Sequence, residues 1–283
     1  MTHTVLLIQC ADRKGIVARV SDFLYRRDAN IVNSDQHSTD PEGGRFFMRI
    51  EFALDESRLQ RATFETEWAG VANELGAVWS IHYSGARPRV GLLVSKQDHC
   101  LFDLLHRQRN GELPMDIALV ISNHPDCRDL VERYGIPFHH IPVAPKSQRA
   151  AERAMLDLVA DSTDFLVLAR YMRILSSDFL ASYAKDIINI HHSFLPSFKG
   201  ADPYTQAYER GVKLIGATAH FVTGELDEGP IIEQMVERVY YKDSIEDLKR
   251  KGRTIENLSL ASAILAYLEH RIIRFENKTV VFQ

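Results

Sequence analysis

The sequence predicts an α/β protein of two parts, a βαββαβ unit followed by an open, doubly wound sheet of mostly parallel strands. The first observation is the order of periodic segments up to residue 83, in which strand-like and helix-like patterns alternate as βαββαβ. The second is a series of compact apolar runs beyond residue 89, separated by helical stretches, as is typical of buried parallel strands. A chain of 283 residues can bury a full core and a smaller accessory unit.

The elements of the first part are identified by periodicity and by the residues at their ends. Ile16, Val20 and Phe23 form an apolar stripe at helical spacing, and Asp12 is positioned to cap that helix by accepting from its unpaired amides. Pro41–Gly44 supplies a hairpin turn between the middle strands. The expected strands cover residues 4–10, 31–39, 45–54 and 78–83, and the expected helices cover residues 14–28 and 56–75.

A short basic piece with glycine and proline, residues 85–89, has the composition of a linker. We therefore predict one domain over residues 1–85 and a second over residues 86–283. Ligands of a doubly wound sheet bind at the carboxyl ends of its strands. In the second domain we expect strands at 90–95, 117–122, 138–141 and 165–169, extended runs at 214–222 and 231–240, and a helix from about 244 to 270.

Composition excludes several classes of protein. The net charge of -4 gives no reason to expect a nucleic acid or another polyanion as partner. The cysteines Cys10, Cys100 and Cys127 lie far apart, which argues against a disulfide framework or a zinc site and fits a reducing compartment. The sequence shows no signal peptide and no apolar stretch of membrane-spanning length, so we expect a soluble, cytoplasmic protein, and we predict no metal site.

The segment from Asn189 to Gly200 is the strongest candidate for chemistry, because an apolar, β-branched run delivers an amide and an imidazole into a loop with proline and glycine. Side chains alternate along an extended segment, so Asn189 and His191 share one face while His192 takes the other. An amide and an imidazolium can both donate to an oxygen that becomes negative when a carbonyl is attacked. A carboxylate from the Asp227 loop can hold the imidazole or take a proton from water, so we expect attack by water or by an amine.

These residues also have ordinary structural explanations. Asn189 and His191 can be turn or capping residues, Asp227 a turn former, and Ser193 a cap before an apolar run. On the residues alone, both interpretations stay open. The turn at residues 96–99 has no glycine and carries an acidic residue, so a phosphate cradle is disfavoured there.

Several spaced motifs resemble the signature of the folate-dependent formyltransferases. They are Asn189-x-His191, the Ser-x-Leu-Pro-x-x-x-Gly of residues 193–200, the Gly-Ala-Thr-x-His of residues 216–220 and the Leu-Asp-x-Gly-Pro of residues 226–230. The βαββαβ unit, with Asp-Arg-x-Gly-Ile-Val at residues 12–17, resembles an ACT domain, which has a ferredoxin-like fold. In order and size the two domains are similar to the family of formyltetrahydrofolate deformylases, which hydrolyse 10-formyltetrahydrofolate to formate and tetrahydrofolate.

The resemblance implies a role for each candidate residue. Asn189 and His191 would donate to the formyl oxygen, and Asp227 would position His191 and orient or deprotonate the attacking water. 10-Formyltetrahydrofolate would be the substrate, no cofactor would be bound permanently, and the reaction would belong to one-carbon metabolism and purine biosynthesis. The folate pocket would be lined by backbone of the Asp227 loop and by Arg170, Tyr171, Met172, Arg173, Ile174, Leu175 and His220.

The resemblance also addresses the acceptor of the formyl group. Glycinamide ribonucleotide formyltransferases hold the substrate phosphate on a glycine-rich loop, and residues 96–99 lack those glycines, which favours water. His192 stands where those enzymes typically carry proline, and it could crowd an amine, relay a proton or be structural. Asp202 stands where deformylases tend to have a basic residue, which would alter a peripheral contact. The alternatives are a glycinamide ribonucleotide formyltransferase, a non-catalytic folate or amino-acid sensor, and a methionyl-tRNA formyltransferase, which would need a basic face.

The ACT resemblance implies a regulatory first domain. Because ACT ligands usually lie between paired domains, it implies a homo-oligomer assembled partly through residues 1–85. It also implies an amino-acid effector near Asp12, Arg13, Lys14, Gly15 and Asn30.

Overall fold

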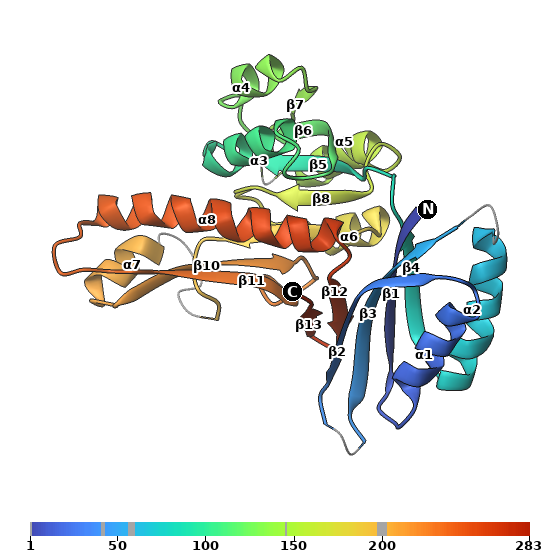
Figure 1. The fold of residues 1–283 in the computed structure, drawn as a ribbon. Helices are drawn as coiled ribbons and strands as arrows, with labels where there is room; N and C mark the ends of the chain where they lie inside the picture. The colour runs from blue at the N-terminus through green and yellow to red at the C-terminus, as the bar shows by residue number, and fades with distance from the viewer. Residues whose placement is uncertain (1, 41–42, 56–59, 145, 197–202) are drawn as a thin grey trace. The chain divides into compact units, whose positions relative to one another are not determined.

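The computed structural model describes residues 2–40, 43–55, 60–144, 146–196 and 203–283. It confirms the predicted fold class, because the chain is an α/β protein in which an antiparallel four-stranded sheet precedes a mostly parallel seven-stranded sheet (Figure 1). The described residues divide into two compact units. Unit 1 contains the chain up to Ala86 together with residues 269–275 and 280–283, and unit 2 contains residues 87–268 and 276–279.

Unit 1 is built on an antiparallel sheet with the strand order β2-β3-β1-β4. Its helices supply one apolar stripe each, so that a single core forms between them and one face of the sheet. The elements follow the predicted βαββαβ order: β1 (Thr2–Ala11), α1 (Ile16–Tyr25), β2 (Asn30–Ser38), β3 (Arg45–Leu54), α2 (Arg61–Leu75) and β4 (Val78–Tyr83).

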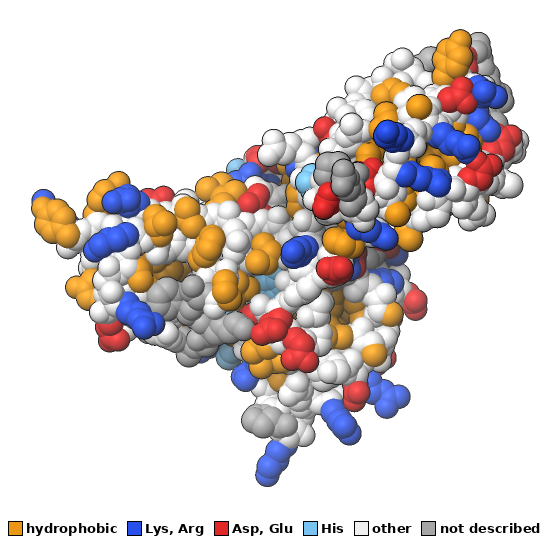
Figure 2. All heavy atoms as spheres, turned by 90° about the horizontal axis from the view of Figure 1, so that it is seen from below, with side chains coloured by type: hydrophobic (Ala, Val, Ile, Leu, Met, Phe, Trp, Pro, Cys, Tyr) orange, Lys and Arg blue, Asp and Glu red, His pale blue; other side chains and the backbone are white. Residues whose placement is uncertain are grey.

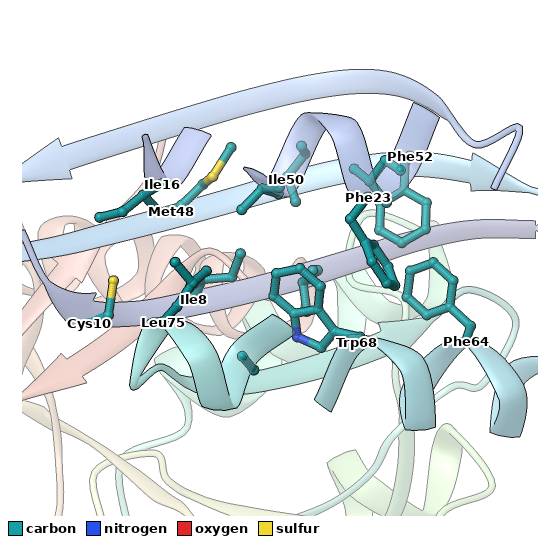
Figure 3. Packing of buried hydrophobic residues seen from close by; sticks show 14 of the residues in the cluster. Ile8, Cys10, Ile16, Phe23, Met48, Ile50, Phe52, Phe64, Trp68 and Leu75 are labelled. Atoms are coloured by element: carbon teal, nitrogen blue, oxygen red, sulfur yellow. The ribbon is translucent and has the colours of Figure 1, made fainter. Parts of the chain in front are cut away.

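Aromatic side chains form the centre of the unit 1 core (Figure 3). Phe23 of α1 meets Phe64 and Trp68 of α2 edge to face, with ring centroids 5.3 Å and 5.1 Å apart. Phe52 of β3 stacks on Phe64 from the sheet side. Edge-to-face contacts of this kind add to the stabilisation that burial of large rings provides, so the two helices are fixed on the sheet by aromatic packing.

The junction between β1 and α1 differs from the sequence prediction. The predicted cap by Asp12 is wrong, because Gly15 occupies the N-cap position in a left-handed conformation and no side chain caps the helix. The carboxylate of Asp12 accepts instead from the hydroxyl of Ser38, at the end of β2. Part of the predicted hairpin turn, Pro41 and Glu42, lies outside the described residues.

The end of the chain returns to unit 1, although we expected all of residues 86–283 in the second domain. Strands β12 (Ile272–Phe275) and β13 (Lys278–Val281) form a hairpin. Ile273 and Phe282 pack with Leu7 and Phe47 in a separate apolar cluster. This cluster removes Ile273 and Phe282 from water, and their burial explains why the end of the chain belongs to unit 1.

Unit 2 is a doubly wound sheet with the strand order β11-β10-β9-β8-β5-β6-β7. The strands from β9 to β7 are parallel, and β10 and β11 are antiparallel additions. The chain leaves β5 toward β6 and later returns to its other side with β8, so the strand order reverses between β5 and β8. Its strands are β5 (Arg89–Val94), β6 (Asp116–Ser122), β7 (Phe138–His140), β8 (Phe165–Leu168), β9 (Ile187–His191), β10 (Leu214–Phe221) and β11 (Ile231–Arg238).

The helices of unit 2 cover both faces of this sheet. Apolar residues of two short helices pack on β5, β6 and β8 in one buried cluster, and the long helix near the end of the chain packs along β9, β10 and β11. The helices are α3 (His99–Arg109), α4 (Arg128–Arg133), α5 (Gln148–Val159), α6 (Ser177–Tyr183), α7 (Pro203–Glu209) and α8 (Ile245–Leu268). Ligands of such folds bind where the strand order reverses, which directs attention to the carboxyl ends of β5 and β8.

One face of the molecule carries mixed charge. On the face shown in Figure 2, basic and acidic side chains are interspersed, in keeping with the net charge of -4. None of the helices in the described ranges combines the length and apolarity needed to cross a membrane.

Candidate active site

Three neighbouring strands bring the candidate polar residues to one edge of the unit 2 sheet. Parallel pairing of β8 and β9 sets Leu168 beside Asn189. Antiparallel pairing of β9 and β10 sets His220 opposite Asn189 and Thr218 opposite His191. The side chains of Asn189, His191 and His220 therefore meet at the point where β8 and β9 end.

The loop between β10 and β11 delivers the carboxylate. Its ends are joined where the amide of Phe221 donates to the carbonyl of Pro230 at 3.0 Å. Asp227 has a left-handed backbone with φ 55. A Cβ added to Gly229 would lie 1.7 Å from the backbone oxygen of Phe221, so only glycine allows this close approach. The conformation of the loop that carries Asp227 therefore depends on Gly229, two residues further along the chain.

The Asp227 carboxylate contacts both histidines. Its Oδ2 lies 3.2 Å from Nδ1 of His191, and its Oδ1 lies 3.7 Å from Nε2 of His220. Nδ1 of His220 lies 2.9 Å from the carbonyl oxygen of Phe221, which can only accept, so this nitrogen carries the hydrogen. Nε2 of a neutral His220 then accepts from Nδ2 of Asn189 at 3.1 Å. That contact orients the Asn189 amide and uses only one of its two N–H groups.

Burial strengthens the electrostatics of this group. Burial by itself raises the pKa of the Asp227 carboxyl, but the contacts with His191 and then with His220 outweigh it, and the pKa lies well below its usual range. His191 is 6% exposed, and its Nε2 has no hydrogen-bond partner among the residues that the structure describes. The site thus contains an ionised carboxylate on one side of the imidazole and an available ring nitrogen on the other.

These side chains border a cavity of about 260 Å³, which we call the formyl cavity. The structure brings together here all three predicted catalytic residues and all seven predicted folate-pocket residues. Leu168, the first residue of the segment that the resemblance assigns to this pocket, also lines the apolar wall, and Val222, which follows β10, was not predicted. The lining consists of Leu168, Arg170, Tyr171, Met172, Arg173, Ile174, Leu175, Asn189, Ile190, His191, His192, His220, Val222, Thr223, Gly224, Glu225, Leu226 and Asp227.

A second buried network lies at the reversal point of the sheet, and sequence reasoning missed it. Glu256 of α8 is 1% exposed and accepts from His99 Nε2 at 2.8 Å and from the Tyr204 hydroxyl at 2.6 Å. Its Oε2 lies 3.4 Å from Nε of Arg170. Burial raises the pKa of the Glu256 carboxyl, but His99 and Arg170 outweigh burial and the net shift is downward. The sequence contains one signal that could have identified Glu256 as buried, because it follows the buried Leu248 and Gly252 at helical spacing.

The turn that we disfavoured as a phosphate cradle holds Arg170 instead. The side chain of Gln97 accepts from Nε of Arg170 at 2.9 Å. The hydroxyl of Ser95 accepts from the amide of Met172 at 2.9 Å. The turn after β5 is therefore bound to the segment after β8.

His192 borders the formyl cavity although it follows the opposite alternation to His191. Burial, and then the charge of Arg170, lowers the pKa of His192 to about 3. The ring is therefore uncharged at neutral pH. Asp202, the other departure noted in the sequence, lies outside the described residues.

The five residues expected near a regulatory ligand do not form one group within a single chain. Asp12, Arg13, Lys14 and Gly15 form the turn after β1, where Arg13 donates to the backbone oxygen of Glu74 at 2.7 Å. Asn30 lies level with His3, since both pair with Ala53, and Asp12 is nine residues further along. At about 3.3 Å per residue the separation is roughly 30 Å.

Comparison with known proteins agrees with these two units. The sequence model of the Formyl transferase family matches residues 88–264, and that of the ACT domain matches residues 4–62. The fold and the site thus define a formyl-transfer enzyme domain that follows an ACT domain.

Full-length relatives narrow the class. The formyltetrahydrofolate deformylase of Synechocystis sp. is 50% identical over 278 residues, which cover 98% of this chain and 97% of that protein. A crystal structure of a formyltetrahydrofolate deformylase from Pseudomonas syringae pv. tomato is 49% identical, covers 100% of this chain and 95% of that one, and superposes with a TM-score of 0.93. The chain belongs to the formyltetrahydrofolate deformylase family. The glycinamide ribonucleotide transformylase 1 of Symbiobacterium toebii is more distant, with 32% identity over 71% of this chain and a TM-score of 0.66.

Proposed function

We propose that this protein hydrolyses 10-formyltetrahydrofolate to formate and tetrahydrofolate, with Asn189, His191 and Asp227 as its catalytic residues. The observation that carries the proposal is the contact between the Asp227 carboxylate and Nδ1 of His191 in the lining of the formyl cavity, with Asn189 on the same strand face. Amide and imidazole donors at one point suit an oxygen that gains negative charge. Membership of the deformylase family supports the same reaction.

The proposed reaction is attack on a formamide. The oxygen of water bonds to the formyl carbon, and the formyl oxygen becomes negative. It accepts from the free N–H of Asn189 and from Nε2 of His191 when that ring is protonated. The carbon–nitrogen bond then breaks as the folate nitrogen receives one proton of the attacking water, and formate leaves with the water oxygen after the second water proton passes to solvent. Asp227 holds the imidazole in place and offsets the charge of its protonated form.

Asp227 acts in this mechanism by orientation and charge more than as a strong base. A carboxyl whose pKa lies well below its usual range holds a proton weakly, so it is a poor acceptor from water. Its two oxygens can still accept hydrogen bonds while one contacts His191. The attacking water would thereby be held beside the formyl carbon.

Water is proposed as the acceptor because the turn of residues 96–99, which lacks glycine, contributes the Gln97 side chain to Arg170. The test is incubation of the protein with 10-formyltetrahydrofolate alone. Formate release without an added acceptor supports hydrolysis. Turnover that requires glycinamide ribonucleotide would establish the transformylase alternative, and folate binding without turnover would establish a sensor.

We further propose an amino-acid effector and a homo-oligomer for the ACT unit. Strand β2 supports the assembly, because it is an edge strand whose Ile31 and Val32 are 38% and 52% exposed. The turn at residues 12–15 is the proposed effector site. Asp12→Ala in the full chain should abolish the response of the deformylase rate to a panel of amino acids. A charged pair, Ile31→Glu with Val32→Lys, should lower the assembled mass in light scattering, and an unchanged mass would exclude this edge.

We place the reaction in the cytoplasm and in one-carbon metabolism, with purine biosynthesis as a use of the released formate. Growth of a deletion strain with and without formate and purines tests this assignment. Rescue by formate supports it, and growth that is indifferent to both contradicts it.

A further inference from the structure

A second cavity, of about 370 Å³, adjoins the formyl cavity. Among the described residues, Arg170, Met172 and His192 border both cavities. We call it the basic cavity. Its lining consists of Gln97, Arg170, Met172, His192, Pro203, Tyr204, Lys249, Arg253 and Glu256.

The ionised side chains of the basic cavity carry an excess of positive charge. Arg170, Lys249 and Arg253 are cationic, and Glu256 is the only acidic residue among the described lining residues, so three positive charges face one negative charge. Lys249 also pairs on the helix surface with Glu246, which is 81% exposed and therefore well screened by water. The cavity suits an anion of small size.

Arg170 provides the strongest indication of a ligand. Its side chain is 7% exposed, and its Nε is engaged by Gln97 and Glu256. Its Nη1 is buried without a hydrogen-bond partner in the part of the chain that the structure describes. Buried donors of this kind are nearly always satisfied, and a guanidinium edge is shaped for a carboxylate.

The nearby cluster of His99, Cys100 and Glu256 does not favour a cation in the same place. Its potential ligand atoms lie within 4.8 Å of one another. However, the Arg170 guanidinium already lies 3.4 Å from Glu256, and its positive charge opposes a metal ion there. Burial also raises the pKa of the Cys100 thiol far above its usual value, which keeps it in the poorly ligating thiol form.

We propose that the basic cavity binds a small carboxylate, and that its ligand during turnover is the formate that leaves the formyl cavity. This inference rests on the proposed hydrolysis, because only that reaction produces formate beside Arg170. Formate is a monoanion with two acceptor oxygens, so it can pair with the Arg170 guanidinium that lines the cavity and face Lys249 and Arg253. The folate product stays in the formyl cavity, so the two products occupy different cavities before they leave.

The first test is the pattern of inhibition by sodium formate in the deformylase assay, at constant ionic strength maintained with sodium chloride. Formate in the basic cavity binds together with 10-formyltetrahydrofolate, so it should lower kcat without raising KM. Formate that competes only for the place of the formyl group would raise KM alone. That second result would overturn the proposal.

The second test removes charge at the opening, using Lys249→Gln with Arg253→Gln. Both residues lie on the outer part of α8, so the fold should be kept. The inhibition constant for formate should rise by about fivefold or more, a change typical of losing two exposed ionic contacts. The matched control is Arg250→Gln on the same helix, since Arg250 pairs with Asp247 and is not a lining residue. Equal inhibition constants in both variants would overturn the proposal.

Direct binding separates this proposal from the proposed function. Line broadening of 13C-labelled formate by the folded protein, without any folate, should occur and should be weaker in the Lys249→Gln, Arg253→Gln variant. A protein that binds formate in this way but releases none from 10-formyltetrahydrofolate would refute the hydrolysis and keep the anion site. A protein that hydrolyses the substrate but broadens the formate signal equally in all variants would refute the anion site alone.

Discussion

Replacement of Asp227 by Asn tests the core of the proposed mechanism, because it keeps the size of the side chain and removes its charge. In the native site, Oδ2 of Asp227 lies 3.2 Å from Nδ1 of His191, and the side chain is 15% exposed. An amide can still accept one hydrogen bond there. It cannot offset the positive charge that His191 carries when it donates to the developing oxyanion.

The size of the effect follows from the geometry. Two unit charges 3.2 Å apart interact by about 5 kcal/mol at an effective dielectric constant of about 20, which sets an upper limit of between three and four powers of ten in rate. In Asp227→Asn, the dipole of the new side-chain amide keeps part of this interaction energy with His191. We therefore expect kcat to fall by about 10²- to 10³-fold, while the affinity for tetrahydrofolate changes by less than about threefold.

The assay measures formate release from 10-formyltetrahydrofolate under single-turnover conditions, and calorimetry measures tetrahydrofolate binding. Glu228→Gln is the matched control, because it makes the same chemical change at the adjacent position, which is not among the cavity-lining residues. Its rate should stay within about threefold of the wild type. An unchanged rate in Asp227→Asn would remove this carboxylate from the mechanism, and equal losses of rate and of folate affinity would assign it to binding.

Three further predictions concern stability and loop geometry. Burial, and then neighbouring charges that include His82, lowers the pKa of His270 to about 4, from a value near 6.5 in the unfolded chain. Between these two pH values the unfolded chain binds more protons than the folded one. The free energy of unfolding should therefore fall as the pH drops from about 6.5 to about 4. Urea unfolding of His270→Asn, which suits the left-handed backbone there, should show a weaker pH dependence, and an equal slope would contradict this. Gly229→Ala should lower kcat at least about tenfold by displacing the catalytic loop, with unchanged kcat as the contrary result in the formate assay. Glu256→Ala should lower the free energy of unfolding, measured in urea, by about 3–5 kcal/mol. The control Glu246→Ala, at an exposed position, should lower it by less than about 1 kcal/mol. Similar losses in the two variants would argue against a buried ionic network.

The fold was predictable because each element has its own pattern in the sequence. The compact apolar runs of the second part all became strands of one sheet. Two details depended on contacts between distant segments. The Asp12 carboxylate binds Ser38 on another strand, and Ile273 and Phe282 find apolar partners more than two hundred residues away. No local pattern contains that information.

The candidate site was predictable to a similar extent. Alternation along one strand was enough to predict that Asn189 and His191 share a face, and the spacing of the later motif pointed to Asp227. The orienting contact from Asn189 to His220 required the antiparallel register of β9 and β10, which a sequence does not state. The pairing of Arg170 with Glu256 was hidden for the same reason, because the sheet order brings the end of β8 beside α8 only after folding.

The two buried carboxylates explain how one site can handle both a charged intermediate and a charged product. Asp227 contacts His191, and Glu256 contacts His99 and Arg170, so each negative charge has its own donors. His192 lies between them and stays neutral, since burial and Arg170 lower its pKa to about 3. A neutral ring neither competes with the oxyanion donors nor attracts formate at the border. Arg170 borders both cavities, so in the proposed mechanism its guanidinium can draw formate from the formyl cavity into the basic cavity, away from the folate.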